Sequence, residues 1–307
     1  MALFATVMGM AGLTIAWIKA HHVADAPLEV AWLLRWLASG LYVFLLALYG
    51  AKLLRYPQAV KADWAHPVRV NFFPAISIGL LLLSIAWAQD APHVAFWMWG
   101  VAAALHLTFT LAVMSSWIHH THYAIQHANP AWFIPVVGNI IVPIAGVRFA
   151  PVDISWFFFS IGLVFWLVLM TIVLYRLFFH EPLPARLTPT LFILIAPPAV
   201  GFLAYVALSG QVDGFARVLY FSGLFLTLLL SSQAARFFRL PFFISAWAYS
   251  FPLAAITIAT FEMGAGGVQT FYIKLGWLLL VVLSAVVILL AIKTLLAAAQ
   301  GKICVPE

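Results

Sequence analysis

Charged residues are scarce in this chain. Only 8% of its 307 residues are Asp, Glu, Lys or Arg, whereas 65% are hydrophobic, and the mean hydropathy is +1.08. A soluble domain carries about 25% charged residues, so this chain cannot cover itself with a water-facing surface. The composition therefore excludes a soluble enzyme and predicts one membrane domain over residues 1–307. The excess of 15 Lys and Arg over 9 Asp and Glu then reports membrane topology, and no nucleic-acid partner is expected.

Cysteine and the common catalytic motifs are also missing. The single cysteine, Cys304, leaves no intrachain disulfide. The sequence has no Walker loop, dinucleotide fingerprint, Cys–His zinc spacing or nucleophile elbow. We therefore expect no enzyme activity, no catalytic residue, no cofactor and no structural metal.

Long apolar runs fill the chain instead. A membrane-spanning helix needs about 20 apolar residues. Ten stretches meet that need, at residues 2–19, 29–52, 67–88, 92–117, 131–148, 154–178, 187–209, 215–236, 241–262 and 271–297. The first run has no basic flank before it, so we expect a first span and not a cleavable signal peptide. The sequence predicts an all-α integral membrane protein with ten transmembrane helices.

The basic residues are distributed unevenly between the gaps. Ten Lys and Arg lie in the gaps after even-numbered spans and at the C-terminal end, and four lie in the gaps after odd-numbered spans. Because loops rich in Lys and Arg stay in the cytoplasm, we expect both termini to be cytoplasmic. Arg35 is left inside the second span, where it could reach the outer surface or pair with a neighbour.

Helix-breaking residues recur in alternate spans. They are Gly9 in the first span, Pro74 in the third, Pro135, Gly138 and Pro143 in the fifth, Pro198 and Gly201 in the seventh, and Pro252 in the ninth. The even spans carry no interior proline. Lipid cannot satisfy the backbone groups that a break exposes, so a broken helix lies against protein or a water-filled cavity. We expect five parallel helical hairpins whose odd helices form an inner pore ring.

The expected pathway has no acidic residue at mid-depth in any odd span. A cation pathway would be expected to carry one. The positive end of an interrupted helix offers partial charge to an anion, so an anion or a neutral solute fits better. Phe73-Pro74 and Phe251-Pro252 occupy matching places in two hairpins. A phenyl ring at such a kink can close a pore by excluding water.

Six of the ten histidines lie between Pro92 and Pro130. His106 and His119 are thirteen residues apart on one expected helix, a spacing seen in membrane haem proteins, but no other span offers the second pair of ligands. The run from His119 through His120 to His122 could hold a transition metal ion adventitiously. An interfacial loop explains the cluster better than either site.

Three motifs resemble one family of membrane proteins. They are His66-Pro67-Val68-Arg69-Val70-Asn71-Phe72-Phe73, Asn129-Pro130-Ala131-Trp132-Phe133-Ile134-Pro135 and Trp247-Ala248-Tyr249-Ser250-Phe251-Pro252. Together they resemble the family of bacterial TehA, the plant guard-cell slow anion channels and the fungal malate and sulfite transporters. The resemblance implies a homotrimer in which each subunit has its own pore lined by the odd helices. It also implies that Phe251 occludes the pore, with Phe73 or Phe72 as a second pore phenylalanine.

Two functions remain open. The resemblance implies a gated channel for small inorganic anions in a bacterial-type inner membrane, since the plant relatives pass chloride and nitrate. The alternative is a secondary transporter for C4-dicarboxylates or oxyanions, since bacterial relatives are associated with dicarboxylate transport or tellurite resistance. A carrier would be expected to have a base at depth, and no odd span has Lys or Arg at its centre. This favours the channel. We expect no control by phosphorylation of long cytosolic tails, as in the plant channels, and Phe4-Ala5 stands where the family often has Phe-Pro.

Overall fold

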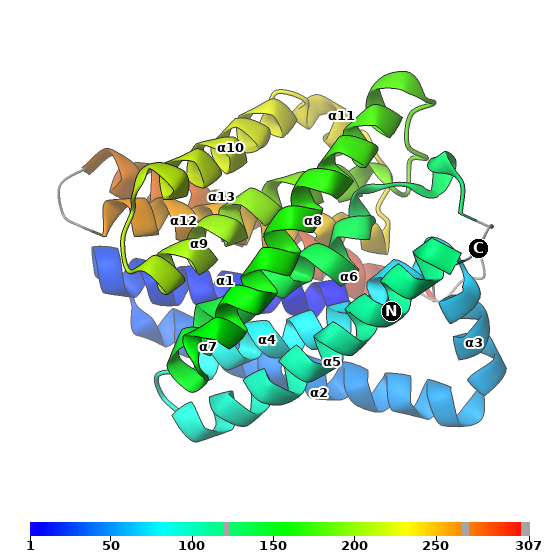
Figure 1. The fold of residues 1–307 in the computed structure, drawn as a ribbon, viewed down its shortest axis with the longest axis horizontal. Coiled ribbons are helices and arrows are strands. Elements are labelled where there is room, and N and C mark those ends of the chain that lie inside the picture. Colours follow the sequence, from blue (N-terminus) through cyan, green and yellow to red (C-terminus); the bar gives the residue numbers. More distant parts are fainter. Residues whose placement is uncertain (120–122, 266–269, 302–307) are drawn as a thin grey trace.

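The computed structural model describes residues 1–119, 123–265 and 270–301, and every regular element within these ranges is helical (Figure 1). The α-helices are α1 (Phe4–Ala24), α2 (Leu28–Arg55), α3 (Pro57–Ala65), α4 (Ala75–Trp87), α5 (Pro92–His119), α6 (Phe133–Val137), α7 (Val142–Phe149), α8 (Val152–Phe179), α9 (Ala196–Ser209), α10 (Gly214–Ser231), α11 (Ala234–Phe238), α12 (Ser250–Gly264) and α13 (Thr270–Ala299). The 3₁₀ helices are η1 (Arg69–Phe72), η2 (Ile125–His127), η3 (Pro130–Trp132), η4 (Gly138–Ile141), η5 (Thr188–Ile195) and η6 (Ile244–Tyr249).

Within the described ranges, nine helical stretches are long and apolar enough to cross a membrane. They correspond to the second to tenth predicted spans, with edges that differ by a few residues. Helix α1 is a 21-residue helix that packs against α2, α4, α12 and α13. The all-helical membrane fold predicted from the sequence is therefore confirmed, and the crossing of the bilayer by α1 remains a prediction.

Burial alternates along the chain between spans that contain a helix break and the even-numbered spans, here called smooth helices, that carry no interior proline. In the third, fifth, seventh and ninth spans, which contain the breaks, 56–89% of the most apolar 18-residue stretch is buried inside the protein. In the smooth helices α2, α5, α8, α10 and α13 the buried share is only 17–33%. The smooth helices expose large apolar side chains, such as Leu33 and Phe44 of α2 and Val281 of α13. Lipid tails solvate such side chains, whereas broken backbone needs protein around it.

The odd segments contact one another in a closed ring. Helix α1 contacts α4, α4 contacts α7, α7 contacts α9, α9 contacts α12, and α12 contacts α1. Each long even helix packs against the two inner helices that flank it in the chain, and α13 packs against α12 and α1. This arrangement surrounds an inner space with the odd segments.

Prolines mark the places where 3₁₀ helix gives way to α-helix. Pro74 precedes the first residue of α4, Pro143 is the second residue of α7, Pro198 is the third of α9, and Pro252 is the third of α12. The first N–H groups of an α-helix have no intrahelical partner, so a proline there loses no hydrogen bond. The predicted breaks are thus changes of helix type at the start of each α segment.

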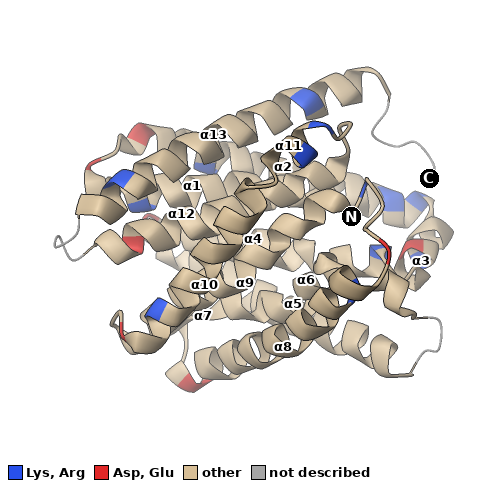
Figure 2. Cartoon of the chain, turned by 90° about the horizontal axis from the view of Figure 1, so that it is seen from above, with Lys and Arg blue, Asp and Glu red and all other residues tan. Residues whose placement is uncertain are grey.

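One short helix was not anticipated from the sequence. Helix α3 lies in the gap between the second and third spans and begins at Pro57, a residue suited to the first helical position. The N-terminus and α3 lie toward the same end of the molecule (Figure 1). Most of the Asp and Glu positions lie at the opposite end (Figure 2). The cytoplasmic placement of both termini remains a prediction.

Candidate functional site

Two cavities are lined by the odd segments, and the larger one also reaches α2 and the loop after α4. The smaller has a volume of about 70 Å³ and the larger about 480 Å³. Three side chains line both cavities: Ile141 of η4, Val200 of α9 and Phe251 of α12. These residues come from three different inner segments, and each is at most 9% exposed. They therefore separate the two cavities and form the constriction between them.

The smaller cavity is almost entirely apolar. Its wall includes Ala75, Ala196 and Phe251, which are the first or second residues of α4, α9 and α12. No charged side chain lines it among the described residues, and its polar side chains are Thr190 and Ser245. The N-terminal ends of three α-helices thus meet at this cavity, where their partial positive charge acts in a region of low polarity.

Phe251 lies on the first turn of α12, directly before Pro252. Its ring packs against α1 at Gly12, since a Cβ placed on Gly12 would lie 3.4 Å from Cδ2 of the ring. Helices α1 and α12 approach closely at this point because Gly12 has no side chain. The ring is therefore held between the two cavities by backbone on one side and by Ile141 and Val200 of the shared wall.

The larger cavity carries charge. Its wall includes the side chains of Lys19, Arg35, Asp90, Arg148 and Glu262. Lys19 of α1 forms an ion pair with Glu262 of α12, and Arg35 of α2 forms one with Asp90. These pairs tie α1 to α12 and α2 to the loop after α4.

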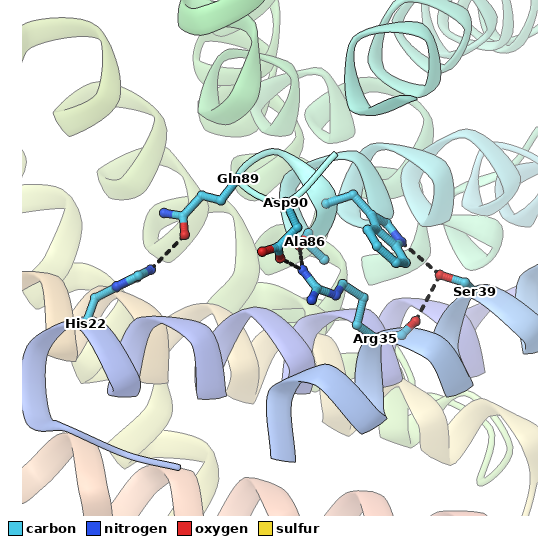
Figure 3. A network of polar contacts seen from close by, with 7 residues as sticks. His22, Arg35, Ser39, Ala86, Gln89 and Asp90 are labelled. Atoms are coloured by element: carbon cyan, nitrogen blue, oxygen red, sulfur yellow. Dashed lines mark hydrogen bonds and ion pairs between the residues drawn. The ribbon is translucent and has the colours of Figure 1, made fainter. Parts of the chain in front are cut away.

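Arg35 pairs with a neighbour, which decides the alternatives that the sequence left open (Figure 3). Its guanidinium also donates to the Ala86 carbonyl at 3.2 Å and lies 4.4 Å from the centre of the Trp87 ring. The Trp87 indole donates to Ser39 at 3.0 Å. A nearly buried cation is stabilised by such contacts, because desolvation alone would make it costly.

The two candidate gate phenylalanines of the third span lie differently. Phe73 lines neither cavity and packs edge-to-face against Trp64 of α3, with ring centres 4.8 Å apart. Phe72 lines the smaller cavity. Phe73 therefore joins α3 to the third span, and of the two rings only Phe72 contacts the candidate pathway.

The predicted helix-break residues divide into two groups. Pro252 and Gly138 line the smaller cavity. The others are packed between helices: Pro74, Pro135, Pro143, Pro198, Gly9 and Gly201. Gly9 lies against Ser250 and Trp247 of the ninth span, and Gly201 lies against Ile140 of the fifth. These two glycines allow neighbouring segments to approach.

His106 is fully buried beside the smaller cavity. Its Nδ1 atom lies 2.9 Å from the Ser77 hydroxyl, and its ring faces Gly138, where a Cβ would lie 2.6 Å from the imidazole. This packing gives His106 a structural role between α5, α4 and η4. His120 and His122 of the possible metal run lie outside the described residues, and the described part of the chain contains no group of three potential metal ligands.

Ile141 and Val200 were not identified from the sequence. Each is a β-branched apolar residue near a proline, and this chain has many such residues. Their pairing with Phe251 depends on how three segments are rotated against one another, and no local sequence signal reports that rotation.

Comparison with known proteins identifies the class. The chain matches the SLAC1 family, described as voltage-dependent anion channel, over residues 1–295. It is 29% identical over 269 residues to the S-type anion channel SLAH3 of Arabidopsis thaliana, covering 84% of this chain but only 42% of that protein. It is 26% identical to the uncharacterized transporter MJ0762 of Methanocaldococcus jannaschii (84% of this chain, 82% of that protein). It is 25% identical to a tellurite resistance protein TehA homolog of Haemophilus influenzae (82% and 77%).

The chain thus belongs to the SLAC1 family of anion channels and transporters, which are membrane proteins and not enzymes. The family resemblance predicted from the three sequence motifs is confirmed. The chain spans less than half the length of the plant channel it matches, so the activity of that whole protein comes to this chain only as a proposal.

Proposed function

We propose that this protein is a gated channel for small inorganic anions whose pore runs through each subunit and is occluded by Phe251. The observation that carries the proposal is the constriction of Phe251, Ile141 and Val200 between two cavities. A constriction lined by apolar side chains can exclude water and with it ions. Movement of the phenyl ring would join the cavities into one passage.

The charges along the passage favour an anion. The smaller cavity has no charged lining residue within the described ranges, and the ends of α4, α9 and α12 that face it carry partial positive charge. The larger cavity has three basic and two acidic side chains on its wall. An anion would meet favourable potential on both sides of the constriction without a deep binding site, and weak binding favours rapid passage.

The topology and assembly belong to the same proposal. We place both termini in the cytoplasm, the larger cavity toward the outside, and the protein in the plasma membrane. The family implies a homotrimer with one pore in each subunit. Native mass measurement of the solubilised protein is expected to give a trimer, and a clean monomer would contradict this part of the proposal.

The proposal is tested by chloride flux in reconstituted vesicles. Wild-type protein is compared with Phe251→Ala and with Phe225→Ala, which removes a ring exposed on α10. We expect a small wild-type flux that rises strongly and without saturation in Phe251→Ala only. If the ring contributes about 1.4 kcal/mol or more to the barrier, its removal increases the rate about tenfold or more.

The alternative is a secondary transporter for C4-dicarboxylates or oxyanions. It predicts a wild-type flux that saturates, prefers dicarboxylates, responds to a proton gradient and is lost in Phe251→Ala. Unchanged chloride flux in Phe251→Ala, with normal expression and folding, would reject occlusion by this ring.

A further inference from the structure

The larger cavity contains one cation whose charge is not neutralised by a neighbour. Lys19 pairs with Glu262, and Arg35 pairs with Asp90. The Arg148 side chain forms no ion pair or hydrogen bond with any residue in the described ranges, and it is exposed to the cavity. Both carboxylates on the wall are already engaged, so Arg148 determines the sign of the charge that a solute meets there.

The other polar groups of this wall also have partners. His22 lies 3.1 Å from the Gln89 side chain (Figure 3). His21 lies 2.7 Å from the Ala26 carbonyl. Arg148 alone among the charged lining residues of the described chain keeps all its donors available. A guanidinium is weakly hydrated and offers five donors, which suits it to contact an anion that has shed part of its water.

The position of Arg148 strengthens its effect. It lies in the last turn of α7, about two helical turns beyond the constriction residue Ile141. A hollow with apolar walls concentrates the field of a charge and raises the local concentration of counter-ions. The smaller cavity has no charged lining side chain in the described ranges, so this effect acts on one side of Phe251 only.

We propose that Arg148 forms an anion-binding site in the larger cavity, which takes up small inorganic anions before they reach Phe251. This inference rests on the proposed channel function. Anions entering from the larger cavity meet Arg148 before Phe251, and those entering from the smaller cavity do not. The effect of Arg148 on flux therefore depends on the side from which the anion enters.

Flux measurements test the site with a charge that can be changed chemically. Arg148→Cys is made together with Cys304→Ser and Phe251→Ala, and chloride current is recorded at low salt. We expect a fall of about two- to fivefold at ~20 mM chloride, since local enrichment by a charge is large when screening is weak. A positively charged methanethiosulfonate reagent, added from the side of the larger cavity, should restore the current, and a negatively charged reagent should reduce it further.

Arg217→Cys in the same background is the matched control. Arg217 is an exposed cation near the start of α10. Like Arg148 it follows an odd-numbered span, but it lines neither cavity. Modification of Arg217→Cys should leave the current within experimental scatter. Equal responses of the two cysteine variants, or complete labelling of Arg148→Cys without any change in current, would overturn the assignment.

A binding measurement separates this inference from the channel proposal. The melting temperature of purified wild type and of Arg148→Gln is followed while chloride replaces gluconate at constant ionic strength. Ligand binding to the folded state raises the melting temperature in a saturable way, and we expect this rise in wild type and its loss in Arg148→Gln. If Phe251→Ala carries no current but the rise depends on Arg148, the site stands and the channel proposal fails. An identical rise in both proteins overturns the site.

Discussion

Gly12 of α1 lies directly against Phe251 of α12, so a Cβ at position 12 would come 3.4 Å from the phenyl ring and 2.8 Å from the Cβ of Ala254. A contact of 2.8 Å between two carbons cannot be accommodated without moving one helix. The closeness of α1 and α12 at the constriction therefore depends on a missing side chain.

Gly12→Ala is expected to destabilise the protein. Overpacking of a close contact costs about 1–3 kcal/mol. The melting temperature in detergent reports the change, and Gly40→Ala is the control because a Cβ at Gly40 of α2 meets no atom within 4 Å. Since alanine favours helix by about 1 kcal/mol over glycine, the control should be neutral or stabilising. A Gly12→Ala protein as stable as wild type would contradict the packing argument.

The two partners of Phe251 in the constriction should also limit flux. Ile141→Ala and Val200→Ala widen the passage but leave the ring, so each should raise chloride flux less than Phe251→Ala does. Combined with Phe251→Ala, each should raise flux further. Ile193→Ala is the control, because Ile193 lines only the smaller cavity. Equal flux in Ile193→Ala and the two constriction variants would show that the narrow point lies elsewhere.

The buried pair of Ser77 and His106 is expected to contribute to stability. Ser77→Ala leaves the Nδ1 atom of a fully buried imidazole without its partner at 2.9 Å. A buried polar atom that loses its partner costs about 1–3 kcal/mol. Thr108→Ala is the control, because the Thr108 hydroxyl bonds only to the Ala104 carbonyl of its own helix and is exposed. A similar loss of stability in both variants would argue against a specific role of the pair.

The same pair bears on the haem hypothesis. A His106 ring enclosed by Ser77 and Gly138 leaves no space for a porphyrin at that position. We expect purified protein to have no Soret band, and a Soret band at stoichiometric intensity would support a haem site.

Acid should release α3 from the second and third spans. Partial burial raises the pKa of the Asp63 carboxyl, but hydrogen bonds from Lys52 at 2.6 Å and Arg69 at 3.0 Å lower it, and the pKa lies below its ordinary value. A lowered folded-state pKa stabilises above the unfolded value of about 3.9, and the stabilisation is lost as pH falls through the folded value.

A spin label at Gln58→Cys, with Cys304→Ser, measures this release. Gln58 is exposed on α3, so the label should not disturb packing. We expect label mobility to stay constant from about pH 7 to pH 4 and to increase below about pH 4. Asp63→Asn should give the mobile spectrum at every pH. A label that stays immobile in Asp63→Asn would rule out the ion pairs as the anchor of α3.

Much of the fold could be predicted from local sequence patterns. The span expected at 92–117 is α5, Pro92–His119, and the runs with interior proline or glycine are the buried ones. Hydropathy and proline placement report on a residue's own neighbourhood, and in a membrane that neighbourhood largely decides which helix faces lipid. The eighth span ends earlier than expected, at Ser231, because the chain turns at polar residues before α11.

The rotation of each segment about its axis could not be predicted. Phe72 and Phe73 are adjacent in sequence, yet one lines the smaller cavity and the other packs on Trp64. Successive side chains in a 3₁₀ helix point about 120° apart, so a shift of one residue exchanges their roles. For the same reason, the family resemblance could not decide whether Phe72 or Phe73 is the second pore phenylalanine.

The sequence by itself determined that this chain is a helical membrane protein of an anion-channel family, because composition, apolar runs and short motifs are local and additive properties. The tertiary structure decided which side chains share a space. Ile141, Val200 and Phe251 come from segments far apart in the sequence, and they meet only when the inner segments close into a ring. The same closure leaves Arg148 without a carboxylate in the described chain, since the two acids nearest the cavity pair with Lys19 and Arg35.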